Sequence, residues 1–499
     1  MDAPPFVSDA DLAATPPSVL ALLRYLTARI EKLEAEIVLL RGGKATPANS
    51  SKPPSSTHPH DKPPSKSKSK RQRGGQPGHE KHQRPLLPPE QCQQVIPVLP
   101  SACRRCGKEL TGVDPEPLRH QVWELPEIKP IVVEYQRHRL VCSCGCSTCA
   151  ELPEGVPTGQ AGPQLIAFAA ILMACFRQSK RRAALFMSMI LNQPASPGWL
   201  VSLQNRAAEA VKPAYDELAR ALPHEAAPHI DESPTKEGPK KAWVWTFVAS
   251  TFTFFACRTS RGADVLKDLL TDAFHGIIHC DRARMYWACG RLQWCWAHLK
   301  RDFQALIDSP CHTHKRLGHD LMRPTKEYFA LWKRVRDGTL TFATFQRRMQ
   351  PIRKEIDSLL LRGYYNPLTH GFCKELVEHK ENLWTFVEVE GIEPTNNAAE
   401  RALRHAVIWR KLSFGTQSAS GSRFVERLLT VVETCRRQSR NTFAWLANAI
   451  EADLAGKPVP SQGQLPLKRY SGKDFEQEVF VPAAHAAFHD RAVLAGMLL

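Results

Sequence analysis

Long apolar runs are missing from this 499-residue sequence. The longest, Leu165 to Phe176, is too short to cross a bilayer and is followed by Arg177 and Lys180. No charged-then-apolar leader opens the chain, and its 15 cysteines are an odd number, so we do not expect a secreted disulfide scaffold. The sequence predicts a soluble cytoplasmic protein without a membrane partner, whose thiols are reduced or bind metal.

Acidic residues are scarce relative to basic ones. There are 50 Asp and Glu against 67 Lys and Arg, a formal net charge of +17 that favours a polyanionic partner such as DNA. Nearly half of this excess lies in residues 44–84, where ten Lys and Arg, including Arg71 and Arg73, face only Asp61 and Glu80. This Pro-, Ser- and Lys-rich stretch predicts a disordered basic linker over 44–90. It either binds phosphates non-specifically or merely keeps the protein soluble.

A heptad pattern occupies the N-terminal region, 1–43. Apolar residues recur alternately every four and every three residues, at Val19, Leu23, Leu26, Ile30, Leu33, Ile37 and Leu40. This spacing predicts a helix over 18–41 that ends before Gly42. The narrow seam favours a short coiled coil, and hence a homo-oligomer, over a helix packed on its own domain.

Six cysteines lie close together in the next region, 91–156. Cys103 and Cys106 form a C-x-x-C turn, and a second cluster, Cys142, Cys144, Cys146 and Cys149, follows a strand-like stretch. Two such turns joined by short strands predict a structural zinc module with four thiolate ligands. The second cluster offers four thiols where two suffice, so all six remain candidates.

Helical patterns follow over 157–224, near 165–178, 182–191 and after Pro197. Short helices joined by tight turns form either a helix-turn-helix DNA reader or a plain helical spacer.

Beyond Pro228 the sequence changes to strands. We expect strands at 229–233, 242–249 and 252–259, then a helix at 263–274 and a fourth strand at 277–281. If the first and fourth strands are parallel neighbours, Asp231 and Asp281 lie side by side and require a cation, for which Mg²⁺ or Mn²⁺ is suited. Glu400, on a helical stretch after Pro394, would complete a two-metal centre. The long interval between Asp281 and Glu400 predicts an inserted helical subdomain at about 304–390, with helices near 328–335, 342–361 and 370–387.

Several short motifs carry a family resemblance by their order and separation. Besides the cysteine turns, they are NSSKPP (49–54), RGGQPGH (73–79), HIDES (229–233), HCDRARMY (279–286), CWAHLKRDF (295–303) and NNAAERALR (396–404). Together they resemble the transposases of the insertion sequence 66 family. The resemblance implies a multidomain α/β protein with a ribonuclease-H-like mixed sheet over 225–455 and a DDE triad of Asp231, Asp281 and Glu400. It also implies that insertion-sequence ends are cut and joined to target DNA, with small accessory proteins as possible partners. The tail, 456–499, matches no known pattern.

Basic and polar residues near Glu400 are the remaining candidates. We expect contacts to DNA from His298, Arg401, Arg404, Arg410 and Lys411, in addition to Arg71 and Arg73. The protein would then associate with the nucleoid. Two other functions fit parts of the sequence: a zinc-containing coiled-coil DNA-binding regulator without catalysis, and a ribonuclease-H-fold nuclease or resolvase that cuts without joining.

Overall fold

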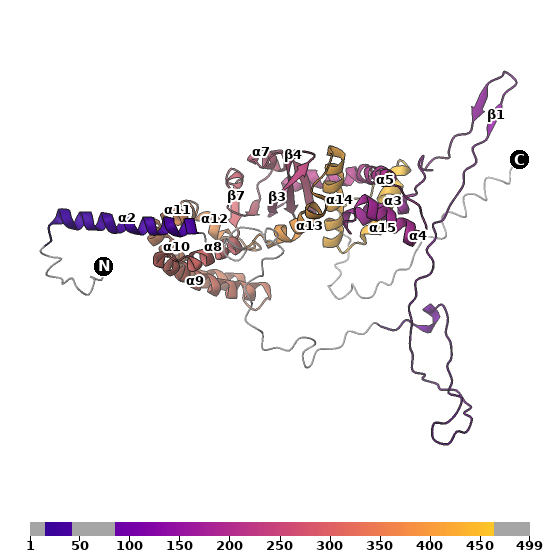
Figure 1. The fold of residues 1–499 in the computed structure, drawn as a ribbon, viewed down its shortest axis with the longest axis horizontal. Helices are drawn as coiled ribbons and strands as arrows, with labels where there is room; N and C mark the ends of the chain where they lie inside the picture. Colours follow the sequence, from indigo (N-terminus) through magenta and orange to yellow (C-terminus); the bar gives the residue numbers. More distant parts are fainter. Residues whose placement is uncertain (1–14, 42–84, 464–499) are drawn as a thin grey trace.

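The computed structural model describes residues 15–41 and 85–463 (Figure 1). The expectations for Arg71, Arg73, most of the basic linker and most of the C-terminal tail concern residues outside these ranges. Among the described helices, none combines the length and apolar character that a membrane span needs.

A five-stranded sheet lies at the centre of the fold, between two groups of helices (Figure 1). Its strands are β3 (His229–Glu237), β4 (Lys240–Val248), β5 (Thr253–Arg258), β6 (Ile277–Cys280) and β7 (Arg291–Trp294). Their order is β5-β4-β3-β6-β7; β3 to β5 form an antiparallel meander, whereas β3, β6 and β7 are parallel. The expected succession of three strands, a helix (α7, Ala263–Leu270) and a fourth strand is confirmed. Strand β7 was not predicted.

Helix α14 (Ala419–Arg437) covers the β5 edge of the sheet. One side chain per turn accepts a backbone N–H of β5, at 2.7–3.2 Å: Glu426 from Cys257, Thr430 from Phe255 and Thr434 from Thr253. The edge strand therefore has partners for donors that would otherwise be free to pair with another chain.

Two further helical layers flank the sheet. Near α14 lie α3 (Pro163–Ala174), α4 (Lys180–Leu191), α5 (Pro197–Ala210), α6 (Lys212–Ala221), α13 (Asn397–Ser413) and α15 (Thr442–Leu454). Buried residues of α3, α5, α13, α14 and α15 share one hydrophobic core with β4 and β5. Helices thus occur where the sequence predicted them in 157–224, while a helix-turn-helix role stays a prediction.

The interval between β7 and α13 is helical. It contains α8 (Trp296–Asp308), α9 (His312–Arg336), α10 (Phe342–Tyr364), α11 (His370–Glu378) and α12 (Glu381–Glu388). Their core is aromatic, built from Trp296, Tyr328, Trp332, Phe345, Trp384 and Phe386, and it is continuous with the core beneath β6 and β7. These helices are therefore attached rigidly to the part of the sheet that carries Asp281.

The N-terminal elements are a long helix and a small hairpin. Helix α2 spans Pro17–Arg41, as expected, and its described heptad positions from Val19 to Leu33 are 42–56% exposed. The hairpin joins β1 (Arg139–Val141) to β2 (Ser147–Cys149). An exposed apolar seam is what a coiled-coil partner would cover, but self-association stays a prediction.

Candidate active site

Strands β3 and β6 bring the two aspartates together. The strands are parallel neighbours in which His229 pairs with His279, and each aspartate lies two residues beyond its histidine. The histidine rings stack with their centroids 3.9 Å apart, and burial lowers the pKa of His229 to about 4, so this pair is neutral. The expected juxtaposition of Asp231 and Asp281 is thereby accounted for by the register of the sheet.

Asp231 lies in a strongly acidic environment. Burial raises the pKa of its carboxyl well above the ordinary value, and the charges of Glu232, Asp281 and Glu400 raise it further. Asp281 accepts the backbone N–H of Ala283 at 2.8 Å. All three predicted carboxylates therefore interact electrostatically at one end of the sheet.

Asn396 joins the start of α13 to β3. Its side-chain amide donates to the carbonyl of Ile230 at 2.7 Å, and its Oδ1 lies 3.2 Å from Nδ1 of His229. Its backbone N–H donates to Sγ of Cys295 at 3.1 Å, and the residue is only 1% exposed. Because Glu400 lies in the first turn of α13, this buried contact determines where its carboxylate lies. The sequence identified the NNAAERALR motif but not this role of its first asparagine.

Glu400 lies beside two residues of α8. Nδ1 of His298 is 3.6 Å from its Oε1 and an Arg301 nitrogen is 3.7 Å from the same atom. Burial raises the pKa of Glu400, whereas the charges of Arg301, Arg404 and Arg401 lower it. Burial also lowers the pKa of His298 to about 3, so His298 is a neutral neighbour of Glu400, and its contact to DNA stays a prediction.

A fourth carboxylate, Glu232, was missed by the sequence reasoning. It accepts a hydrogen bond from the Tyr286 hydroxyl at 2.6 Å and pairs with Arg261 at 2.8 Å. Burial and the charge of Asp281 raise its pKa to about 7. The available signal was that HIDES contains a second acid and HCDRARMY ends in a tyrosine. Glu232 adds to the negative charge around Asp231 from the opposite face of β3.

The predicted DNA-contacting residues of α13 divide into two groups. Arg401, Arg404 and Lys411 are exposed. Arg410, in contrast, donates to Oγ of Ser233 at 3.1 Å and to the carbonyl of Pro234, so it ties α13 to β3.

The first cysteine turn has the backbone geometry of a metal-binding knuckle. Gly107, at φ +72°, donates its N–H to the carbonyl of Cys103 at 2.9 Å, and the N–H of Cys103 donates to Lys108 at 2.8 Å. The backbone N–H of Cys106, followed by that of Arg105, lowers the pKa of the Cys103 thiol.

The second cysteine turn has the same hydrogen-bond pattern, but its glycine follows the first cysteine by three residues rather than four. Gly145, at φ +85°, donates to the carbonyl of Cys142 at 2.8 Å, and the N–H of Cys142 donates to Cys146 at 2.8 Å. The backbone N–H of Cys144 lowers the pKa of the Cys142 thiol. Each turn therefore presents a pair of thiols, Cys103 with Cys106 and Cys142 with Cys144. Two of the six candidate cysteines remain: Cys146, whose carbonyl accepts the N–H of Cys142, and Cys149, which lies on β2.

The sequence also matches known families. Residues 158–423 match the family described as Transposase IS66 family. The chain belongs to this family. Residues 4–85 match a second family, DUF6444, whose function is unknown.

The curated relatives of this IS66-family chain come from Sinorhizobium fredii. The uncharacterized protein y4hP is 24% identical over 409 residues, which are 74% of this chain and 73% of the relative. Another, y4qI, is 24% identical over 246 residues, 44% of this chain and 45% of y4qI. A third, y4jD, is 20% identical over 292 residues, 52% of this chain and 56% of y4jD.

The acids of this family member suit a hard divalent cation. Mg²⁺ prefers oxygen ligands, and the site supplies carboxylates from β3, the end of β6 and α13. Oε1 of Glu400 is buried and lacks a hydrogen-bond partner, and Asp231 is crowded by like charges; a cation relieves both conditions. Among residues 15–41 and 85–463, one set of three metal-type ligand atoms lies mutually within 4.8 Å, and it consists of Cys295, His298 and Glu400. Within the same ranges, neither the carboxylates of Asp231, Asp281 and Glu400 nor any three thiols of the two cysteine turns lie mutually this close.

Proposed function

We propose that this IS66-family transposase cuts the ends of its insertion sequence and joins them to target DNA at Asp231, Asp281 and Glu400. The observation that carries the proposal is the β3–β6 register together with the Asn396 contact, because these bring acids from distant parts of the chain to one place. The sheet order, with three antiparallel strands followed by two parallel ones, supports a ribonuclease-H-like fold.

The reaction consists of two in-line displacements at phosphorus. In the first, water forms a bond to phosphorus and the bond to the 3′ oxygen breaks, leaving a free 3′-hydroxyl at the element's end. In the second, this hydroxyl attacks a target phosphodiester and releases a target 3′-hydroxyl. Mg²⁺ or Mn²⁺, held by the three carboxylates, would activate the attacking oxygen and neutralise charge on the phosphate.

The protein's own residues position the reacting groups. Asn396 holds Glu400 against β3, and Tyr286 and Arg261 hold Glu232 behind Asp231. The exposed Arg401, Arg404 and Lys411 lie on the same helix as Glu400 and suit contacts to flanking phosphates, while Arg71 and Arg73 would tether DNA from the linker. Catalysis then depends on positioning and charge neutralisation, without a covalent protein intermediate.

Strand cleavage and joining by the full-length protein test this proposal. Labelled duplexes carrying the sequence that flanks the gene are incubated with Mg²⁺ and target DNA. We expect Asp281→Asn to abolish both steps and to leave end binding intact. Asp268→Asn, on the exposed side of α7, is the matched control and keeps activity, since Asp268 makes only a 3.8 Å contact to Arg258.

Other results of this assay would indicate a different function. Cleavage without joining by the wild type indicates a nuclease or resolvase. Specific end binding without any cleavage indicates a DNA-binding regulator. Activity retained by Asp281→Asn removes the acidic triad from the proposal.

The proposal also covers zinc binding, self-association and the location of the protein in the cell. We infer one structural zinc ion held by Cys103, Cys106, Cys142 and Cys144, with Cys146 and Cys149 outside the ligand set; the support is the backbone geometry of each turn taken singly. Helix α2 would pair with α2 of a second copy, and small accessory proteins could join the complex. The protein would act on nucleoid DNA in the cytoplasm.

A further inference from the structure

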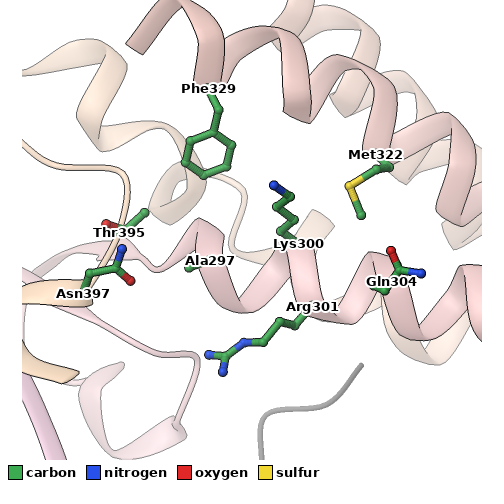
Figure 2. Close-up of a pocket in the computed structure, with 8 residues that line it drawn as sticks. All are labelled: Ala297, Lys300, Arg301, Gln304, Met322, Phe329, Thr395 and Asn397. Carbon is green, nitrogen blue, oxygen red and sulfur yellow. The ribbon is translucent and has the colours of Figure 1, made fainter. Parts of the chain in front are cut away.

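A cavity of about 360 Å³ lies next to the acidic site (Figure 2). It is open to solvent on one side and is lined by residues of α8, of α9 and of the segment that leads into α13. From α8 it is lined by Ala297, Lys300, Arg301 and Gln304. Its size is near the lower end of the roughly 300–1,000 Å³ typical of ligand pockets, so it suits a small, single occupant.

The walls combine an aromatic surface with a cation. Phe329 and Met322 extend from α9 into the cavity, and Lys300 reaches from α8 toward the ring of Phe329 (Figure 2). The Lys300 ammonium is 5.6 Å from the centre of this ring. An aromatic face beside a cation suits a planar group that carries a phosphate.

Amide groups supply the polar part of the lining. Gln304 lies at one end of the cavity, and Asn397 and Thr395 lie at the other (Figure 2). Amide side chains both donate and accept hydrogen bonds, as recognition of a base edge requires. A bare phosphate would need neither these amides nor the aromatic ring.

Arg301 connects the cavity to the catalytic carboxylate. One of its terminal nitrogens is 3.7 Å from Oε1 of Glu400, whereas its Nε–H is buried and has no hydrogen-bond partner. Arg301 therefore both lines the cavity and contacts Glu400. The occupant would therefore lie within one side chain of the acidic site.

We propose that this cavity receives one unstacked nucleotide of the DNA end, adjacent to the phosphodiester held at the acidic site. The proposal rests on the proposed function for its substrate, and adds how that substrate is held. The base stacks on Phe329, its edge meets Gln304 and Asn397, and its phosphate lies against Lys300. The free-energy cost of extracting one base from the stack is offset by stacking and hydrogen bonding in such a pocket.

Binding of duplexes that lack single bases tests the pocket. The probes are end duplexes, intact or with one abasic site at each of the terminal positions, measured with the full-length protein in Ca²⁺. We expect Phe329→Ala to weaken binding of the intact duplex roughly 5- to 150-fold, because stacking on an aromatic side chain is worth about 1–3 kcal/mol. On one abasic duplex the variant and the wild type should bind equally. Phe329→Trp should restore the affinity.

Phe342→Ala is the matched control, since Phe342 is also a half-buried aromatic but packs near Phe345 on α10. It should bind every duplex like the wild type. A Phe329→Ala defect of the same size on all duplexes, or no defect, overturns the pocket. With the wild type alone, 2-aminopurine at successive positions should change fluorescence strongly at one position, and a uniform response overturns the proposal independently of any variant. Failure of the wild type to cut intact duplexes in Mg²⁺ concerns the proposed function and leaves these binding results interpretable.

Discussion

Replacing Asn396 by alanine would detach the first turn of α13 from β3. Its side chain donates to the carbonyl of Ile230 and lies against Nδ1 of His229, and its backbone N–H donates to the sulfur of Cys295. Alanine removes the two side-chain contacts and keeps the backbone N–H bond to the Cys295 sulfur. The substitution therefore tests the contact that positions Glu400 without touching a carboxylate.

The magnitude follows from the groups left without partners. Each buried polar group that loses its hydrogen bond costs about 1–3 kcal/mol. With two such groups, and incomplete additivity, we expect the free energy of unfolding to fall by about 2–4 kcal/mol. For a cooperative unit of about 300 residues this lowers the thermal midpoint by roughly 3–6 °C. Displacing Glu400 by an ångström would slow strand cleavage about 100-fold.

Calorimetry and the cleavage assay, run on the same preparations, provide the measurement. Asn397→Ala is the control for stability, because the adjacent asparagine is exposed and should change the free energy of unfolding by less than about 0.5 kcal/mol. Equal midpoints for the two variants would refute the assignment of Asn396. So would a cleavage defect in Asn396→Ala without loss of stability, since positioning and stability depend on the same bonds.

Three further variants address charge, zinc and self-association. Burial raises the pKa of Glu232 in the folded state from 4.5 to about 7, so between these pH values the folded state binds one proton more than the unfolded state, and stability falls as pH rises. Glu232→Gln should flatten this part of the curve of thermal midpoint against pH. An unchanged slope would contradict the raised pKa of Glu232. Atomic absorption should find one zinc per wild-type chain, little in Cys144→Ser and a full complement in Cys149→Ser; equal losses would refute the ligand choice. Leu26→Lys, in the exposed α2 seam, should reduce the mass measured by light scattering, whereas Tyr25→Lys, outside the seam, should not.

The sheet was largely predictable because most of its strands have a recognisable local sequence pattern. The runs before and after Ser250 are aromatic and β-branched, as half-buried or buried strands require, and the turn between them is short. Strand β7 was missed since its four residues, RLQW, carry no period of their own; they become a strand by pairing with β6. Short strands of this kind are defined by tertiary partners rather than by sequence.

The sequence predicted which acids form the site, but it did not predict the hydrogen bonds and ion pairs that hold them in place. The contact between Asn396 and Ile230 spans 166 positions, and the pair of Glu232 with Arg261 spans 29. Such pairs depend on the packed arrangement of strands and helices, and no spacing in the sequence encodes them. The hydrogen bond from Arg410 to Ser233 also could not be predicted from the sequence, because it joins residues 177 positions apart.

The distribution of cations around the four acids suggests which of them most needs a metal. Glu232 has Arg261 at 2.8 Å, and Glu400 has Arg301 at 3.7 Å. The charges acting on Asp231 come instead from Glu232, Asp281 and Glu400, and all of them raise its pKa. Arginine partners thus reduce the repulsion at Glu232 and Glu400, whereas the negative charge around Asp231 is left for an external cation to neutralise. A chain of net charge +17 thus concentrates negative charge at the one place where the proposed reaction needs a metal ion.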